Sequence, residues 1–189
     1  TMTGEAISYI GNIPEFENSS HHNYVDVIQA SRSTGSVLKP FLFAAALQAG
    51  ELLPTQLIAD VPTRMGGFAP ENFNRNYSGA IPASEALTRS LNIPAVKLLQ
   101  SYGVGRFQAL LQSMGMSTLH RSPGNYGLTL ILGGAEGSLW ELTGLYASLA
   151  RSSQFGDSIS GNEPIFSAPT VVEKFDPLLD SALTPPIAA

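Results

Sequence analysis

The most informative segment of the chain is Arg32-Ser33-Thr34-Gly35-Ser36-Val37-Leu38-Lys39-Pro40-Phe41. It places Ser36 and Lys39 three residues apart at the start of a predicted apolar helix. Side chains at positions i and i+3 share one helix face, with Cβ atoms roughly 5–6 Å apart. A partly desolvated lysine can lose its proton near neutral pH and accept the proton of a serine hydroxyl. The spacing indicates a serine nucleophile with its own base; the alternative is a helix cap followed by a surface lysine.

The residues around Ser36 favour a hydroxyl at a helix N-terminus. Gly35 allows a tight turn directly before the serine. Pro40 has no N–H, so it cannot bond the carbonyl of Ser36, its i−4 partner. Residues 41–47 are all apolar, and Gly50 is a good C-terminal stop. We therefore expect a buried helix with a loosened first turn, where the helix dipole favours developing negative charge.

A second segment, residues 84–99, predicts two helices that meet at a polar corner. Ser84 is a candidate N-cap, Asn92 a candidate helix end, and Pro94 suits the first position of the next helix. Ser90 and Asn92 would then lie on the corner, where a hydroxyl and an amide can relay a proton and hold a substrate amide. The alternative is that Asn92 only caps a helix and that Ser90 is solvated.

In this order, the two segments resemble the transpeptidase domain of class A penicillin-binding proteins. The resemblance rests on the Gly-Ser-x-x-Lys-Pro-Phe motif at 35–41 and the Ser-Leu-Asn-Ile-Pro-Ala-Val motif at 90–96. Residues 3–12, 68–73 and 128–151 agree with the family in the same order, and the 1C subgroup is the most similar. The resemblance implies an α/β chain with the fold of penicillin-binding proteins and serine β-lactamases, here mostly its helical part with an N-terminal strand.

The resemblance also implies roles for four residues. Ser36 would be the acylated nucleophile, with its backbone N–H forming half of an oxyanion hole, and Lys39 would be its base. Ser90 would help to pass the proton to the leaving amine, and Asn92 would bind the amide of the donor peptide. The implied activity is that of a peptidoglycan DD-transpeptidase acting through an acyl-serine on D-Ala-D-Ala stem peptides. β-Lactam antibiotics would acylate the same serine, and no cofactor or metal is implied.

One element of the family pattern is missing. Family members carry Lys-Thr/Ser-Gly on a strand that lines the opposite wall of the cleft. The lysines of this chain are Lys39, Lys97 and Lys174, and none of them begins that motif. The resemblance therefore implies that these 189 residues do not include the cation for the donor carboxylate, the strand that supplies the second oxyanion N–H, or the closing strands that follow. We expect residues 1–151 to be a partial transpeptidase domain and residues 152–189 to be an irregular, weakly ordered segment.

The composition is compatible with a piece of such a domain. The 189 residues, 43% of them hydrophobic, can bury a core. A net charge of −5 argues against binding to nucleic acid or to an anionic membrane surface. The absence of cysteine excludes disulfides and thiolate metal sites. The family implies a periplasmic or extracytoplasmic location at the bacterial inner membrane, with the membrane reached only through parts absent from this chain.

The remaining pattern predicts mainly helices with strands at the edges. Residues 5–10 alternate and suit a strand, and residues 52–80 form a long connection of the kind that borders clefts. Residues 104–114 predict a short amphipathic helix stopped by Gly115. The residues from Ser138 to Glu141 have capping-box spacing and should open a helix that runs to about Arg151.

Two alternatives to the transpeptidase remain open. The first is a β-lactamase or β-lactam sensor on the same fold, which would need a carboxylate that activates the deacylating water. Glu71 precedes the Ser-x-Asn element, and the acidic positions after it match no such pattern. The second is a non-catalytic fragment or scaffold, which the missing Lys-Thr/Ser-Gly motif supports.

Overall fold

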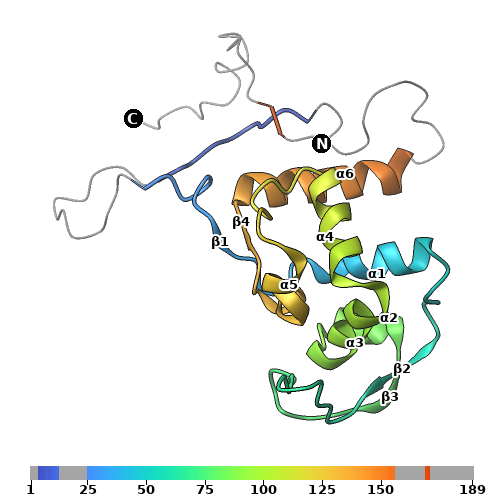
Figure 1. Cartoon of the computed structure of the whole chain (residues 1–189). Helices are drawn as coiled ribbons and strands as arrows, with labels where there is room; N and C mark the ends of the chain where they lie inside the picture. The colour runs from blue at the N-terminus through green and yellow to red at the C-terminus, as the bar shows by residue number, and fades with distance from the viewer. Residues whose placement is uncertain (1–3, 13–24, 156–168, 171–189) are drawn as a thin grey trace, which may run out of the picture.

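The computed structural model describes residues 4–12, 25–155 and 169–170. Helices predominate, and the strands form two short antiparallel pairs, β1 with β4 and β2 with β3 (Figure 1). In chain order the elements are β1 (Arg32–Ser33), α1 (Lys39–Gln48), β2 (Leu57–Asp60), β3 (Gly79–Pro82), α2 (Ala83–Thr88), α3 (Asn92–Tyr102), α4 (Val104–Ser113), α5 (Pro123–Tyr126), the 3₁₀ helix η2 (Gly127–Leu132), β4 (Glu136–Gly137) and α6 (Leu139–Phe155).

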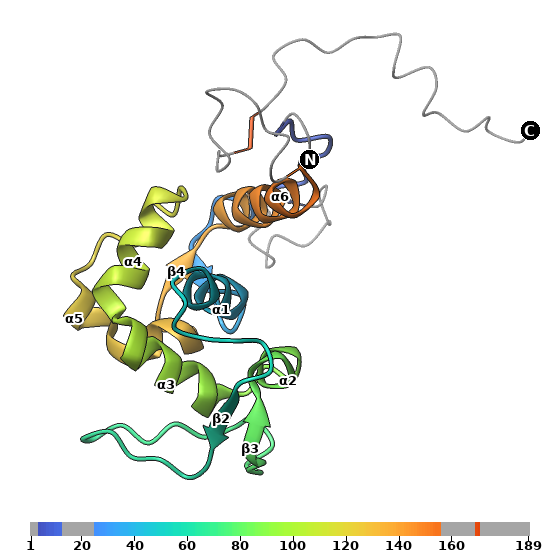
Figure 2. The same ribbon diagram turned by 90° about the vertical axis from the view of Figure 1, so that its right-hand side faces the viewer.

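Helix α1 lies at the centre because its sequence is apolar on nearly every side. Leu42 and Ala46 of α1, and Leu38 directly before it, have no exposed surface, as expected for a helix that has no polar face. In both views α6 lies on one side of α1, and α2 and α3 lie on the other (Figure 2). Phe41 of α1 meets Tyr146 of α6 edge to face, with ring centroids 5.1 Å apart. The prediction that this helix is buried is confirmed.

The β1–β4 pair fixes the segment that leads into α1. Arg32 pairs with Gly137 and Ser33 with Glu136, so the chain before α1 lies beside the chain before α6. Gly133 makes this approach possible: its φ is +102°, and a Cβ there would lie 2.6 Å from Ser33 Oγ and 2.9 Å from the backbone nitrogen of Gly35. Only glycine fits both the backbone conformation and the space.

The β2–β3 ladder lies within the long connection predicted for residues 52–80. It pairs Leu57 with Pro82 at one end and Asp60 with Gly79 at the other. The intervening loop, residues 61–78, returns the chain directly to α2. Sequence analysis missed these two strands, because neither shows the alternation of apolar and polar residues that marks a half-buried strand.

Several predicted boundaries are confirmed. Gly50 follows α1 with φ +71°, and Gly115 follows α4 with φ +106°. The capping box at the start of α6 forms: the N–H of Glu141 donates to Ser138 Oγ at 3.1 Å, and the N–H of Ser138 donates to Glu141 Oε2 at 3.2 Å. The helix continues past Arg151 to Phe155.

Among the described residues, the pairing of the predicted N-terminal strand is a single bridge. Glu5 lies parallel to Thr170, and the N–H of Ala6 donates to the Thr170 carbonyl at 2.9 Å. A strand needs a ladder of partners, and the alternation of residues 5–10 does not supply one. Most of the predicted irregular segment, residues 152–189, lies outside the described residues.

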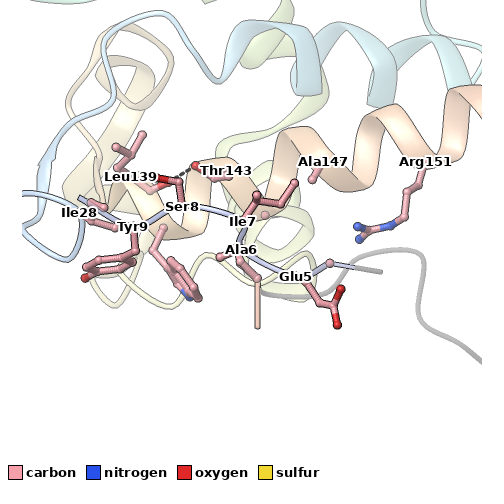
Figure 3. Close-up of a pocket in the computed structure, with 14 residues that line it drawn as sticks. Glu5, Ala6, Ile7, Ser8, Tyr9, Ile28, Leu139, Thr143, Ala147 and Arg151 are labelled. Carbon is pink, nitrogen blue, oxygen red and sulfur yellow. Dashed lines mark hydrogen bonds between the residues drawn. The ribbon is translucent and has the colours of Figure 1, made fainter. Parts of the chain in front are cut away.

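A pocket of about 320 Å³ lies between residues 4–9 and α6 (Figure 3). Leu139, Thr143 and Ala147 line it from the helix, and none of the predicted site residues contributes to it. Within the described ranges, every helix is too short or too polar to span a bilayer.

Candidate active site

Lys39, the first residue of α1, lies buried among polar partners. It is only 1% exposed. Its Nζ donates to the backbone carbonyl of Ser90 at 2.7 Å and to Asn92 Oδ1 at 2.7 Å, and the Ser90 hydroxyl lies 3.3 Å away. Lysine is rarely buried without such partners, because desolvating an unpaired ammonium is costly. The structure thus brings together three of the four predicted site residues.

The corner between α2 and α3 supplies these partners. Helix α2 ends at Thr88 and α3 begins at Asn92, so the predicted two-helix corner is present. Ser90 lies on it with φ +52°, a left-handed conformation that non-glycine residues rarely adopt. Backbone strain of this kind persists only where the surrounding contacts hold it, and it gathers at functional sites.

Two details of the predicted corner are wrong. Ser84 is not an N-cap, because α2 begins at Ala83 directly after Pro82. Asn92 does not end a helix but is the first residue of α3. Its side chain contacts Lys39, and the N-terminus of α3 takes its side-chain acceptor from Asn72, a residue distant in sequence.

Burial favours the neutral form of the Lys39 amine. Desolvation lowers the pKa of Lys39 from its usual 10.5 to about 8. About a tenth of the side chain is then neutral at pH 7. A neutral amine keeps two N–H groups and one lone pair. Because the Ser90 carbonyl and Asn92 Oδ1 can only accept, the lone pair is left for a hydroxyl. Lys39 can therefore take a proton from a serine.

Ser36 lies half-buried in the turn that directly precedes α1. The backbone N–H of Lys39 donates to the Ser36 carbonyl at 3.1 Å. Tyr146 of α6 donates its hydroxyl to the Val37 carbonyl at 2.7 Å and so ties this turn to α6. Among the described residues, neither the Ser36 hydroxyl nor its N–H has a hydrogen-bond partner. The fourth predicted residue is thus in place one turn before Lys39, with its hydroxyl not hydrogen-bonded to the amine.

A supporting network beneath the corner was not predicted. Asn72 Oδ1 accepts the N–H of Asn92 at 2.9 Å, and Asn72 Nδ2 donates to Asp60 Oδ1 at 2.7 Å. Both Asn72 and Asp60 are almost fully buried. These contacts join residues 12 and 20 positions apart, so no local sequence pattern marks them. Within the described part of the chain, no three histidine or carboxylate side chains gather as a metal site.

The sequence comparisons match this chain to a known family. The family described as "Penicillin binding protein transpeptidase domain" matches residues 2–161. Penicillin-binding protein 1C of Escherichia coli K12 is 36% identical over 188 residues, which cover 93% of this chain and 24% of that protein. Penicillin-binding protein 1F of Bacillus subtilis 168 is 28% identical over 156 residues, which cover 81% of this chain and 20% of that protein.

Solved structures have the same fold. Penicillin-binding protein 1A of Haemophilus influenzae matches with a TM-score of 0.56 and 27% identity, over 66% of this chain and 19% of that one. PonA1 of Mycobacterium tuberculosis matches with a TM-score of 0.58 and 24% identity, over 67% of this chain and 36% of that one. The chain spans about a quarter or less of the length of the two curated relatives. Because the family match covers most of its residues, the chain belongs to the transpeptidase domain family of the penicillin-binding proteins.

Proposed function

We propose that this chain supplies the nucleophile, the base and the Ser-x-Asn corner of a peptidoglycan DD-transpeptidase. The observation that carries the proposal is the buried amine of Lys39, held by Ser90 and Asn92 at 2.7 Å each. A surface lysine after a helix cap, the alternative on sequence grounds, would be solvated and would retain its ordinary pKa. The family membership supports the same assignment.

In the proposed acylation, Ser36 attacks the carbonyl carbon of the penultimate D-alanine. The neutral Lys39 amine takes the hydroxyl proton as the Oγ–C bond forms. The free N–H of Ser36 would donate to the resulting oxyanion. As the C–N bond breaks, the Ser90 hydroxyl gives its proton to the leaving amine and regains one from the Lys39 ammonium. D-Alanine leaves, and the donor peptide remains as an ester on Ser36.

The second half reverses these proton movements. The amine of another stem peptide attacks the ester carbonyl and gives up a proton, and Ser36 Oγ leaves and recovers its hydrogen. A β-lactam would acylate the same oxygen by opening of its ring, and the acyl group would stay attached. The family also supports an extracytoplasmic location for the parent protein.

Asn92 is suited to hold the donor peptide. Its side-chain nitrogen has two hydrogens, and one of them is donated to the Glu71 carbonyl at 2.8 Å. The other is left for a substrate carbonyl. Because the Glu71 carbonyl can only accept, the Asn92 amide cannot flip without losing its bond to that carbonyl.

A fluorescent penicillin tests this proposal directly. Intact-mass measurement after incubation should show one stable adduct, located on Ser36 by peptide mapping. The adduct should be absent from Ser36→Ala and retained in the control Ser31→Ala, which changes an exposed serine of the same segment. No adduct on the folded chain would refute the proposal for this chain. Rapid hydrolysis of the drug through a short-lived adduct would assign a β-lactamase instead.

A further inference from the structure

Asp60 is a buried carboxylate that the proposed chemistry does not use. It has no exposed surface. Its two oxygens accept from Asn72 Nδ2 at 2.7 Å and from the backbone N–H of Ser78 at 2.8 Å. Among the described residues, no cationic side chain pairs with it. Burial of a charge is costly unless its hydrogen bonds are specific, so the position of Asp60 needs a reason beyond packing.

The position of Asp60 is explained by the orientation that it gives to the Asn72 side chain. Its side-chain nitrogen donates to Asp60 and also to the Asn76 carbonyl at 2.9 Å. Both of these partners can only accept, so the amide has one possible orientation and its oxygen must face the other way. That oxygen accepts from the backbone N–H groups of Asn92 at 2.9 Å and Ile93 at 3.4 Å.

Asn72 therefore acts as the cap of α3. The residue before α3, Leu91, has no side chain that can accept a hydrogen bond, and the helix has no cap of its own. With Asn72 on its backbone N–H and the Glu71 carbonyl on its side chain, Asn92 is held from two sides. Its remaining polar atom, Oδ1, is directed at Lys39 Nζ.

We propose that Asp60 and Asn72 are positioning residues that fix the Asn92 amide against Lys39. Asp60 fixes the orientation of the Asn72 amide, and Asn72 in turn fixes the first backbone N–H groups of α3. The position of this helix start determines where Asn92 presents its side-chain oxygen and its free side-chain N–H. The catalytic meaning of this network rests on the proposed function. Its effect on Lys39 does not, because the contacts are present in the free chain.

The other charged groups near α1 do not replace this network. Glu85 of α2 pairs with Arg89, the residue directly after that helix, at 3.0 Å. On the loop, the Glu71 carboxylate pairs with Arg75 at 3.4 Å. Tyr146 of α6 donates its hydroxyl to the Val37 carbonyl. In the described part of the chain, the other titratable side chains on α3 and α6 are Lys97, Tyr102, Glu141 and Arg151.

Three variants test the proposal. Asn72→Leu removes the amide at similar size, and Asp60→Asn leaves only one acceptor oxygen for the two donors that Asp60 now serves. The matched control is Asn74→Leu, the same substitution at an exposed loop position. Circular dichroism and the fluorescence of Trp140 establish that each variant is folded. Asp60→Asn is the milder change and serves where Asn72→Leu does not fold.

Two readouts separate positioning from mere stability. The first is acylation of Ser36 by a fluorescent penicillin: the first-order rate constant should fall by about tenfold or more in Asn72→Leu and Asp60→Asn, with non-covalent binding changed less than about threefold. The second is NMR titration of the chain labelled with ¹³Cε-lysine, in which Lys39→Met assigns the Lys39 signal. Its midpoint should move up by about one unit in Asn72→Leu, because a loosened corner admits water.

The outcomes distinguish this inference from the proposed function. If the wild-type chain forms no adduct, the proposed function fails and the lysine titration alone decides the inference. Acylation and a Lys39 titration that both remain at wild-type values in folded Asn72→Leu and Asp60→Asn would overturn it, as would equal effects in Asn74→Leu.

Discussion

Replacing Lys39 with methionine should change how the stability of the chain depends on pH. Burial lowers the pKa of Lys39 from 10.5 to about 8. Between these values the unfolded chain holds a proton that the folded chain has released, so the free energy of unfolding increases with pH. The contribution of Lys39 to the free energy of unfolding is least favourable below pH 8, and it becomes more favourable as the pH rises to about 10.5. Lys39→Met removes this dependence.

The size of the effect follows from the shift. One pKa unit corresponds to about 1.4 kcal/mol, so a shift from 10.5 to about 8 corresponds to roughly 3 kcal/mol over the whole range. Integrating the linkage relation from about pH 7.5 to about pH 9.5 gives a rise of about 2 kcal/mol for the wild type relative to the variant. Tyrosine ionisation is common to both proteins and cancels in this difference.

Urea unfolding followed by the fluorescence of Trp140, the only tryptophan, measures this difference at several pH values. The control is Lys97→Met, the same replacement at a lysine of α3 that is not fully buried. Lys39→Met should lose the rise in stability with pH, and Lys97→Met should retain it. If the difference between wild type and Lys39→Met stays constant within about 0.5 kcal/mol over this range, Lys39 is not desolvated in the folded chain and the assignment of the base fails.

Three further predictions concern the framework of the site. Ser90→Gly should leave the chain as stable as the wild type or more stable by up to about 1 kcal/mol, because glycine adopts φ +52° without strain. The same variant should slow acylation by penicillin about a hundredfold, and parallel losses of stability and acylation would contradict this. Gly133→Ala should destabilise the chain by about 2 kcal/mol or more in urea unfolding, because its Cβ would lie within 3.0 Å of Gly35; a neutral effect would mean that this backbone approach is not tight. Ser138→Ala should lower stability by about 1 kcal/mol through loss of the bond from the Glu141 N–H, while Ser138→Asp should retain most of it; equal losses in both variants would exclude capping as the cause.

Local chemistry made much of the framework predictable. The apolar run of α1 predicted a buried helix, and Gly50 and Gly115 marked helix ends, because glycine adopts the left-handed conformation that follows a helix. The capping box of Ser138 and Glu141 was also readable, since all of its contacts lie within three residues. Such signals succeed because they depend on neighbours along the chain.

The predicted features that failed depended on distant partners. Residues 5–10 alternate like a strand, but pairing in the described structure is limited to one bridge between Glu5 and Thr170. The β2–β3 ladder was missed because neither strand alternates apolar and polar residues, and its pairing crosses the loop of residues 61–78. Ser84 resembled an N-cap, but Pro82 sets the start of α2 one residue before it.

For the candidate site, the sequence and its resemblance to the family were enough to propose Ser36, Lys39, Ser90 and Asn92, because a helix start and a helix corner bring residues at short spacings close together. The tertiary structure alone decided that Lys39 is buried against that corner, that its pKa falls to about 8, and that Asp60 and Asn72 lie beneath Asn92. A desolvated environment and a hydrogen bond between residues 20 positions apart arise only when separate segments pack together, and no pattern within one segment contains them.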